Sequence, residues 1–430
     1  MKKIKLFSLA AIGAMALVGA VSCGDGTTTT DNSNTFKVWA PIEHKAMYEQ
    51  IFTDFKAANP EYADMKFEFG ACSEAEAYNQ VSKDVTGAAD VFTMANDQLY
   101  NLINIGALAQ LGGDYKTFVE TNNSKAAVDA SKGTDGGIYA YPMTLDNGYM
   151  LTYDASVVKD YDENTTFFDV AKQCAEAGKQ FVVPMGDSWY GYGFFAGFGG
   201  KYSVEYGADG KESKITCNYN EQAGVDTGNF LIDLANTEGF AYADGGAAGE
   251  EGLKLNAYLD TNMSKIGAFI SYPGAVKTYV LDKDAWDDAN VRCDVLPLMK
   301  EGDTTKRMRT FLGMKMVGVN KQSQNLVLAH KFAQYITSEQ VQLLRYKNYN
   351  YGPSNIKAAE DKAVKSDVAL VGLNKQFAAA SDPQINVPST FWTSVQNFGC
   401  SIGHKKEINK DNLQASLNSL VEDMITIADK

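Results

Sequence analysis

The residue types that most often carry out chemistry are few and scattered in this sequence. Of the three histidines, His44, His330 and His404, no two have the spacing of metal ligands, and His330 lies in a helical pattern where we expect it at the surface. Asp282-Lys283-Asp284 begins like a calcium loop, but Trp286 and a missing glycine break that pattern. The chain has no Gly-x-Ser-x-Gly turn, no P-loop and no Gly-x-Gly-x-x-Gly turn after its first strand. We therefore expect no metal, no cofactor and no catalytic residue.

One cysteine stands where it can be modified. Three lysines precede an uncharged apolar stretch, Leu6 to Val21, and small residues then run into Cys23. This order is typical of a secretory signal peptide, which is too short and wrongly flanked to span a membrane. A cysteine directly after the cleavage point looks like a bacterial lipobox, in which the thiol is diacylated and becomes the new N-terminus. We expect residues 1–22 to be removed and Cys23 to anchor the protein to the outer face of the cytoplasmic membrane; the alternative is plain secretion with an ordinary Cys23.

Residues 23–35 have almost nothing to bury, so we expect a flexible tether between the lipid and the folded body. The remaining cysteines are odd in number, far apart and without a Cys-x-x-Cys pair, which argues against a disulfide framework and leaves a single bridge open. We expect them to behave as small buried apolar residues. They are Cys72, Cys174, Cys217, Cys293 and Cys400.

The mature chain is acidic. Without the three signal lysines it has 36 basic and 53 acidic residues, a net charge of −17. This balance argues against nucleic acid as a partner and against a basic patch for anionic lipids. From Thr35 onward the chain is too long for one ordinary core and suits two domains.

The elements that must position any site alternate between strands and helices. The first part of the chain predicts strands at 36–40, 65–69 and 91–94, a helix that ends before Asn59-Pro60 and another at about 98–105 that stops at Gly106. Such alternation indicates a mainly parallel sheet with helices on both faces.

A long strand-like passage, residues 138–153, is expected to cross between two lobes. The series that follows predicts a helix at about 167–177 closed by Gly178, a strand at 181–183, a Gly- and aromatic-rich turn from Trp189 to Gly200, a strand at 266–272 with Pro273 opening a helix, and a last helix with an apolar stripe from Leu413 to Ile427.

The order and spacing of six segments resemble the extracellular solute-binding proteins of ABC importers, in particular the branch that contains maltose-binding protein. The resemblance runs from about Phe36 to the C-terminus. The segments are Lys37-Val38-Trp39 with the helix to Phe55; Asp90 to Asn96-Asp97, leading to Gly106-Ala107-Leu108; Ala140-Tyr141-Pro142; Asp294-Val295-Leu296-Pro297; Phe311-Leu312-Gly313 through Val319-Asn320; and Pro388-Ser389-Thr390-Phe391-Trp392.

This resemblance implies an α/β, two-lobed periplasmic-binding-protein type II fold. Each lobe would be a doubly wound, mostly parallel sheet flanked by helices, with a ligand cleft between the lobes outside the carboxyl ends of the strands. Chain order implies that residues 36–144 plus 314–351 form lobe 1 and that residues 145–313 plus 352–430 form lobe 2.

The resemblance also implies polar ligand-binding residues. Glu43 and His44 follow the first strand, where similar proteins place a charged pair that hydrogen-bonds sugar hydroxyls. Asn96 and Asp97 close the third strand, and Asp146 falls where similar proteins carry a carboxylate at the lobe crossover. Each position also has an ordinary structural interpretation, because Glu43 and Asp97 stand at helix starts and Asp146 in a turn.

Aromatic rings supply the other half of the expected site. Tyr190 and Trp392 match rings that stack on sugar, whereas Trp189 and Tyr272 lie beside such positions, and core packing is the alternative for all four. Four positions depart from the pattern of maltose-binding protein, which puts maltose itself in doubt as the ligand. Where that protein has an arginine, a tryptophan, a carboxylate and an aromatic ring, this chain has Gln98, Met94, Ser188 and Gly274, respectively.

What the resemblance implies is a lipid-anchored, extracellular, monomeric receptor. It would bind a carbohydrate, foremost an oligosaccharide, without transforming it, and deliver it to the transmembrane subunits of an ABC permease. Three alternatives stay open: the same scaffold holding another solute such as a polyamine or a metal-chelated anion; a surface glycosidase that uses two of Glu43, Asp97 and Asp146 as acid and base; and an adhesin whose cleft is filled by side chains.

Overall fold

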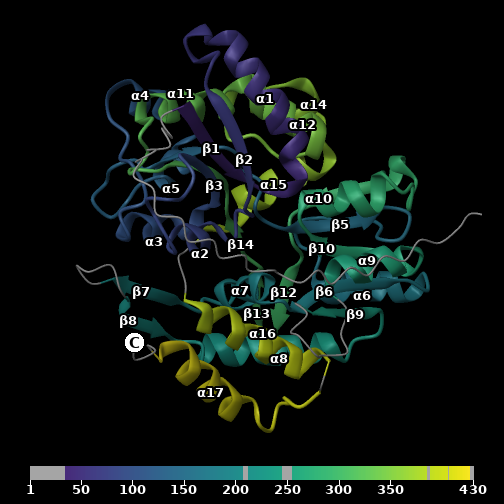
Figure 1. Cartoon of the computed structure of the whole chain (residues 1–430). Coiled ribbons are helices and arrows are strands. Elements are labelled where there is room, and N and C mark those ends of the chain that lie inside the picture. The colour runs from purple at the N-terminus through teal and green to yellow at the C-terminus, as the bar shows by residue number, and fades with distance from the viewer. Residues whose placement is uncertain (1–33, 207–211, 245–253, 385–387, 405, 427–430) are drawn as a thin grey trace, which may run out of the picture.

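The computed structural model describes residues 34–206, 212–244, 254–384, 388–404 and 406–426. The expected signal peptide, Cys23 and most of the expected tether lie outside these residues. Within them the chain forms two five-stranded sheets flanked by helices, together with three two-stranded ribbons (Figure 1). We call the first sheet with its helices the first lobe and the second sheet with its helices the second lobe.

The first lobe is built on a sheet with the strand order β2-β1-β3-β15-β4. Its strands are β1 (Thr35–Ala40), β2 (Lys66–Ala71), β3 (Val91–Ala95), β4 (Ala140–Pro142) and β15 (Lys315–Val319). Its helices are η2 (Ile42–His44), α1 (Lys45–Ala58), η3 (Pro60–Tyr62), α2 (Ala77–Val81), η4 (Asn96–Gln98), α3 (Leu99–Asn104), α4 (Gly113–Asn122), α5 (Lys125–Ala130), α11 (Leu326–Ile336) and α12 (Glu339–Tyr349). Figure 1 shows α1, α11 and α12 together on the outer side of this sheet.

The second lobe is built on a sheet with the strand order β11-β5-β10-β6-β9. Its strands are β5 (Met150–Asp154), β6 (Gln180–Gly186), β9 (Phe240–Asp244), β10 (Ile266–Ser271) and β11 (Val291–Asp294). Its helices are α6 (Phe167–Glu176), α7 (Ser188–Gly197), α8 (Gln222–Ala235), α9 (Leu255–Asn262), η5 (Met263–Lys265), α10 (Pro273–Ala275), η6 (Val276–Leu281), η7 (Asp288–Asn290), α15 (Val368–Ala379), α16 (Ser389–Gly403) and α17 (Leu413–Ile425). The ribbons pair β7 (Tyr202–Tyr206) with β8 (Glu212–Cys217), β12 (Leu298–Glu301) with β13 (Thr304–Arg307), and β14 (Thr310–Leu312) with β16 (Ser381–Pro383), while α13 (Ile356–Ala359) and α14 (Lys362–Ser366) link α12 to α15.

Each sheet is mostly parallel, as the alternation of strands and helices predicted. In the first sheet only β15 runs against the other strands, since it pairs antiparallel with both β3 and β4. In the second sheet only β5 is reversed, since it pairs antiparallel with both β10 and β11. Both reversed strands directly follow a passage of the chain from one lobe to the other. Their amino ends therefore lie at the same sheet edge as the carboxyl ends of their parallel neighbours.

Local sequence signals end the helices where they were expected. The apolar stripe Met47, Ile51 and Phe55 of α1 is buried, and the side-chain amide of Asn59 donates to the Phe55 carbonyl, 2.8 Å away, just before Pro60. A capping box of Thr166 and Asp169 opens α6. At its other end Gly178 adopts a positive φ of 65°, which a residue with a Cβ rarely takes.

The passage from Trp189 to Gly200, expected as a turn, is instead mostly helix α7. Asp187 caps this helix by accepting from the Trp189 amide. Its glycines serve close packing rather than a turn, because a Cβ on Gly193 would stand 2.2 Å from the Arg309 carbonyl and one on Gly197 would stand 2.8 Å from the Arg307 carbonyl. Tertiary contact thus overrides the weak helix propensity of glycine.

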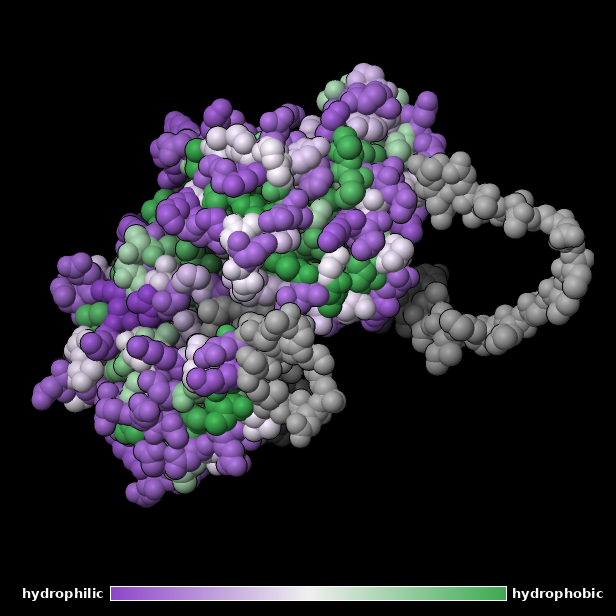
Figure 2. Space-filling model, turned by 90° about the vertical axis from the view of Figure 1, so that its left-hand side faces the viewer, coloured by the Kyte–Doolittle hydropathy of each residue, from purple (hydrophilic) through white to green (hydrophobic). Residues whose placement is uncertain are grey.

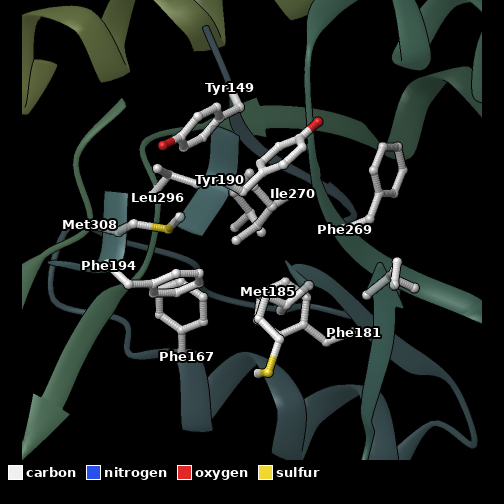
Figure 3. Close-up of a cluster of buried hydrophobic side chains, with 14 of the residues drawn as sticks. Tyr149, Phe167, Phe181, Met185, Tyr190, Phe194, Phe269, Ile270, Leu296 and Met308 are labelled. Carbon is white, nitrogen blue, oxygen red and sulfur yellow. The ribbon is translucent and has the colours of Figure 1, made fainter. Parts of the chain in front are cut away.

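Buried apolar side chains gather separately in the two lobes. Figure 3 shows part of the core of the second lobe, where Phe167, Phe181 and Phe194 pack beneath Tyr149 and Tyr190. In the first lobe one cluster surrounds β1 and α1, and another lies beneath α2 and α3. The crossover residues 138–153 leave the first sheet as β4 and enter the second as β5, as predicted.

The predictions for His330 and for the cysteines have different outcomes. The prediction that His330 lies at the surface is wrong. Its side chain is 8% exposed, bonds to Tyr141 (Nδ1 to Oη, 2.9 Å) and stacks on Tyr115. Burial lowers its pKa to about 4, so the ring is neutral and belongs to the core of the first lobe. Among the described residues the five cysteines beyond Cys23 form no disulfide with one another, and all are buried except Cys217, which is half-buried.

The displayed face in Figure 2 is mostly hydrophilic, with apolar residues scattered among polar ones in small patches. This matches the acidic composition of the chain. No helix in the described ranges is long and apolar enough to cross a membrane.

Candidate functional site

A cavity of about 650 Å³ lies between the two lobes. It opens where the parallel strands of both sheets end, since β3 leads into Asp97, β6 into Ser188 and β10 into Tyr272. The reversed strand β15 contributes its first residue, Lys315, at the same edge. A volume in this range is typical of a site for a small molecule, about 300–1,000 Å³.

The first lobe and the crossover give the cavity an acidic side. Glu74, Asp97 and Asp146 line it together with one cation, Lys315. Burial raises the pKa of all three carboxyl groups, and the charge of Lys315 opposes that shift in each case. Three carboxyl groups thus share a single lysine as their cation in the cavity lining, and the cavity is rich in hydrogen-bond acceptors.

The crossover carboxylate is held by the backbone of another crossing segment. Asp146 accepts a hydrogen bond from the Gly352 amide, 2.8 Å away, and the hydroxyl of Thr144 also hydrogen-bonds to it. Beside it, the Asn147 amide donates to the side chain of Gln384, 3.0 Å away, and Gln384 in turn bonds to Asp97. The other carboxylate oxygen of Asp97, Oδ1, is buried and has no hydrogen-bond partner among the described residues.

The second lobe gives the cavity an aromatic side made of Trp189, Tyr272 and Trp392, all half-buried. Trp189 is the second residue of α7, and its ring meets Tyr149 and Tyr190 edge-on with centroids 5.0 Å apart in both pairs. Edge contacts of this kind hold a ring in place while leaving a face available.

The other two rings are positioned by different elements. Trp392 lies on α16 and packs edge-on against Phe391, with an interplanar angle of 88°. Tyr272 follows β10, exchanges hydrogen bonds with Asn256 through its hydroxyl, and passes so close to Gly274 that a Cβ there would stand 3.0 Å from the ring. Gly274, one of the departures from the family pattern, therefore makes room for Tyr272.

Five of the nine residues predicted to bind ligand line this cavity: Asp97, Asp146, Trp189, Tyr272 and Trp392. The other four do not. Glu43 is exposed on η2, and its carbonyl accepts from the Tyr349 hydroxyl. His44 is 1% exposed and bonds to Tyr351, which does line the cavity.

Asn96 and Tyr190 are also turned away from this cavity. The side-chain oxygen of Asn96 accepts from the Met314 amide, 3.0 Å away, and so fastens η4 to the start of β15. Tyr190 is 3% exposed in the core of the second lobe, and its ring centroid lies 4.7 Å from that of Tyr149 (Figure 3). In this structure Trp189 rather than Tyr190 lines the cavity.

The cavity also contains polar residues that the sequence did not point to: Glu74, Lys315, Tyr351 and Gln384. Glu74 could have been found from the rule that ligands lie beyond strand carboxyl ends, because it follows β2. Gln98 lines the cavity too, but its amide donates to the carbonyls of Glu74 and Ala75 and thus holds the loop that presents Glu74.

In the described ranges no group of three or more His, Cys, Asp or Glu side chains is arranged to hold a metal ion. His44 is a poor candidate for acid–base work as well. Burial, together with the charge of Arg345, lowers the pKa of His44 to about 4, so this ring is neutral at physiological pH.

Comparison with known proteins gives consistent matches. The model of a family described as bacterial extracellular solute-binding protein matches residues 50–372. The galactooligosaccharide-binding protein of Bacillus subtilis (strain 168) is 26% identical over 312 residues, which cover 71% of this chain and 69% of that protein. A maltooligosaccharide ABC transporter solute-binding lipoprotein of Streptococcus pneumoniae (strain R6) is 25% identical over 329 residues, which cover 72% and 70%.

Solved structures match almost the whole described fold. A structure solved with acarbose is 26% identical, with a TM-score of 0.76 over 91% of this chain and 98% of that one. The maltodextrin-binding protein MalE1 from L. casei BL23, solved without ligand, is 21% identical, with a TM-score of 0.72 over the same shares. These likenesses confirm the two-lobed type II fold that the sequence resemblance implied.

Proposed function

The chain belongs to the bacterial extracellular solute-binding proteins, and from this membership we propose that its interlobe cavity binds an oligosaccharide for delivery to an ABC permease. The observation that carries the proposal is the division of the cavity into an aromatic side and an acidic side. The rings of Trp189, Tyr272 and Trp392 come from the second lobe, and the carboxylates of Glu74 and Asp97 come from the first.

This division suits the chemistry of a sugar. A pyranose ring presents C–H groups on its faces, which an aromatic ring covers, and hydroxyl groups around its edge, which carboxylates accept from. By analogy with stacking of bases on aromatic side chains, each such ring contributes about 1–3 kcal/mol. The named ligands of relatives, galactooligosaccharide and maltooligosaccharide, support the substrate class. The departures at Gln98, Ser188 and Gly274, all on the cavity wall, favour a sugar other than maltose.

Binding would act by shifting a conformational equilibrium. A ligand that touches both sides of the cavity stabilises the arrangement in which the lobes are closed around it, to the extent that it prefers that arrangement. We propose residues 36–144 plus 314–351 and residues 145–313 plus 352–430 as the two bodies that move. The segments between them pass through Asp146, Lys315 and Tyr351, which line the cavity. The permease would recognise the closed form, and the ligand would leave chemically unchanged.

A screen of binding by titration calorimetry tests the substrate class. The purified chain from Thr35 onward is titrated with malto- and galactooligosaccharides of two to six units, with the corresponding monosaccharides and with spermidine. Binding of an oligosaccharide with a Kd at or below the micromolar range supports the proposal. Absence of binding to every sugar contradicts it. Chromatography of the sugar after prolonged incubation checks that none has been hydrolysed, the outcome that would instead support a glycosidase.

A cationic solute is the second candidate, because three carboxylates face a single lysine in the cavity. Spermidine in the same titration separates the two candidates. A cation held by these carboxylates should bind less tightly as ionic strength rises, whereas binding of a neutral sugar should change little with salt.

We further propose that the protein acts as a monomer held at the cell surface by a lipid on Cys23. The lipoprotein named among the relatives supports this placement. Replacement of that cysteine, Cys23→Ser, should release the protein from membranes into the medium, as measured by immunoblotting of both fractions. Retention of the variant in the membrane fraction would rule out the lipid as the anchor.

A further inference from the structure

Beneath the cavity wall of the first lobe lies a buried arginine whose charge acts on both Glu74 and His44. Arg345, on α12, is 1% exposed. Its Nη2 donates to the Tyr48 hydroxyl, 2.6 Å away, and its guanidinium lies over the Tyr48 ring, 5.3 Å from the centroid. Its Nε and Nη1 are buried and have no hydrogen-bond partner among the described residues. Burying the N–H groups of a charged side chain without hydrogen-bond partners is unfavourable, so the groups that surround them matter.

His44 is one of the groups on which the charge of Arg345 acts. It lies one helical turn before Tyr48 and therefore on the same face of the helix. Its ring packs against those of Tyr349 and Tyr351, with centroids 4.6 and 5.5 Å apart. Its Nε2 is 3.2 Å from the hydroxyl of Tyr351, and its Nδ1 is buried without a partner. Burial, helped by the charge of Arg345, lowers the pKa of His44 to about 4, so its imidazole is neutral.

A neutral imidazole has one N–H donor and one acceptor nitrogen, and its surroundings decide which is which. Arginine donates only, so a proton on Nδ1 would add another unpaired donor to the buried groups around Arg345. A lone pair on Nδ1 instead offers negative charge to the guanidinium. The proton then resides on Nε2, where it is donated to the oxygen of Tyr351. The Tyr351 hydroxyl keeps its own hydrogen for a group in the cavity.

We propose that Arg345 is a positioning residue that acts through His44: it selects the Nε2–H tautomer, and this makes the Tyr351 hydroxyl a hydrogen-bond donor toward the ligand. The inference rests on the proposed function in that Tyr351 is taken to meet a sugar oxygen. It adds a donor to a cavity whose acidic groups are acceptors. A sugar hydroxyl that donates to a carboxylate can accept from Tyr351 at the same time.

The tautomer is measured without any ligand. Nitrogen-15 spectra that correlate ring nitrogens with ring protons distinguish an N–H nitrogen from one with a lone pair. The chain has only three histidines, and His44→Gln assigns the signals of His44 by their loss. We expect Nε2–H in the wild type at pH 7 and a mixture of tautomers in Arg345→Met. His330, whose Nδ1 bonds to Tyr141, is the internal control and should keep its signals. A wild-type His44 protonated on Nδ1 would overturn the inference even if Arg345→Met does not fold.

The binding consequence is measured by calorimetry with maltotetraose or galactotetraose, whichever the sugar titration selects. Tyr351→Phe should weaken binding about five- to tenfold, and His44→Phe by the same factor. His44→Gln, whose amide reaches the place of Nε2, should stay within about twofold of the wild type. The double variant His44→Phe with Tyr351→Phe should lose no more than either single variant. Additive losses would overturn the inference, because they would mean that His44 acts independently of Tyr351. If neither sugar binds, the proposed function fails and the tautomer measurement alone decides the inference.

Discussion

Removal of the Trp392 ring is the sharpest test of the aromatic side of the cavity. This indole lies on α16, is half-buried and is held by edge contacts with Phe391 and Phe311. Because its exposed part lines the cavity, Trp392→Ala removes a stacking surface without opening the core beneath it. Phe391, which is fully buried, keeps its own contacts in the core of the second lobe.

The expected magnitude follows from the ring's contribution to stacking. A loss of about 1–3 kcal/mol corresponds to a Kd about five- to 150-fold larger, and we expect at least a tenfold increase, about 1.4 kcal/mol. Because the side chain is only half-buried, the free energy of unfolding should fall by no more than about 1–2 kcal/mol. Trp392→Phe, which keeps a smaller ring, should show an intermediate Kd.

Titration calorimetry with the sugar found by the screen measures the Kd, and thermal unfolding monitored by circular dichroism checks that the variant is folded. Trp39→Phe is the matched control, because Trp39 lies on β1, packs in the first lobe and does not line the cavity. The control should bind as the wild type does. An unaltered Kd in a folded Trp392→Ala variant would refute the stacking role and, with it, the assignment of this wall as the sugar-binding surface.

Three further changes test other parts of the molecule. The pKa of His330 is about 4 in the folded protein against 6.5 unfolded, so its contribution to stability is complete above pH 6.5 and is lost as the pH falls toward 4. Urea unfolding should show that His330→Gln removes on the order of 3 kcal/mol of the pH dependence of the unfolding free energy over that interval. An equal change of the unfolding free energy with pH in both proteins would contradict this. Gly193→Ala should lower the free energy of unfolding by about 1–3 kcal/mol, because the new methyl group meets the Arg309 backbone, whereas Gly191→Ala meets only a side chain and should cost less. Because burial raises the pKa of Asp97, its charged form opposes folding above that pKa. Asp97→Asn should therefore raise the Tm at pH 7.5 by about 2 °C or more, and this gain in Tm should shrink as the pH is lowered. Sugar binding by the same variant should weaken.

Strand ends explain which site residues the sequence could identify. Asp97 follows a buried strand and Asp146 lies in the crossover, and both positions depend on local pattern and chain order alone. Lys315 was missed because it is the first residue of its strand rather than a residue that follows one. Only the reversal of β15 within a parallel sheet places that amino end at the cavity, and no sequence periodicity reports the direction of a strand.

The position of each side chain on a helix explains why Trp189 lines the cavity although Tyr190 was the ring matched to a sugar-stacking position. The glycines of this passage favoured a turn, and a turn gives no rule for which side chains share a face. Because the passage is helix α7, neighbouring side chains point about 100° apart, so that Trp189 reaches the cavity while Tyr190 enters the core. The glycines fit a helix only because Arg309 and Val395 approach it closely, which the local sequence does not reveal.

His44 shows a different limit of prediction from the sequence. A histidine after the first strand was expected to touch the ligand, and the structure instead buries it behind Tyr351. Arg345, whose charge acts on His44, comes from α12. It lies 297 residues further along the chain than Tyr48, to which it bonds. Such a buried network of a histidine, an arginine and tyrosines forms only when distant helices pack together, so the sequence offers the residues without their arrangement.

The acidic side of the cavity also bears on when the lobes should close. Glu74, Asp97 and Asp146 already have raised pKa values because their surroundings exclude part of the water. Closure would exclude more, and an ionised carboxylate that loses water without gaining a donor opposes the motion. A sugar supplies hydroxyl donors at that moment and lifts the opposition, whereas an apolar solute of the same size lacks them. If the cavity binds a sugar as proposed, the carboxylates would select for ligands twice, first as binding groups and then as charges that oppose closure of an empty cavity.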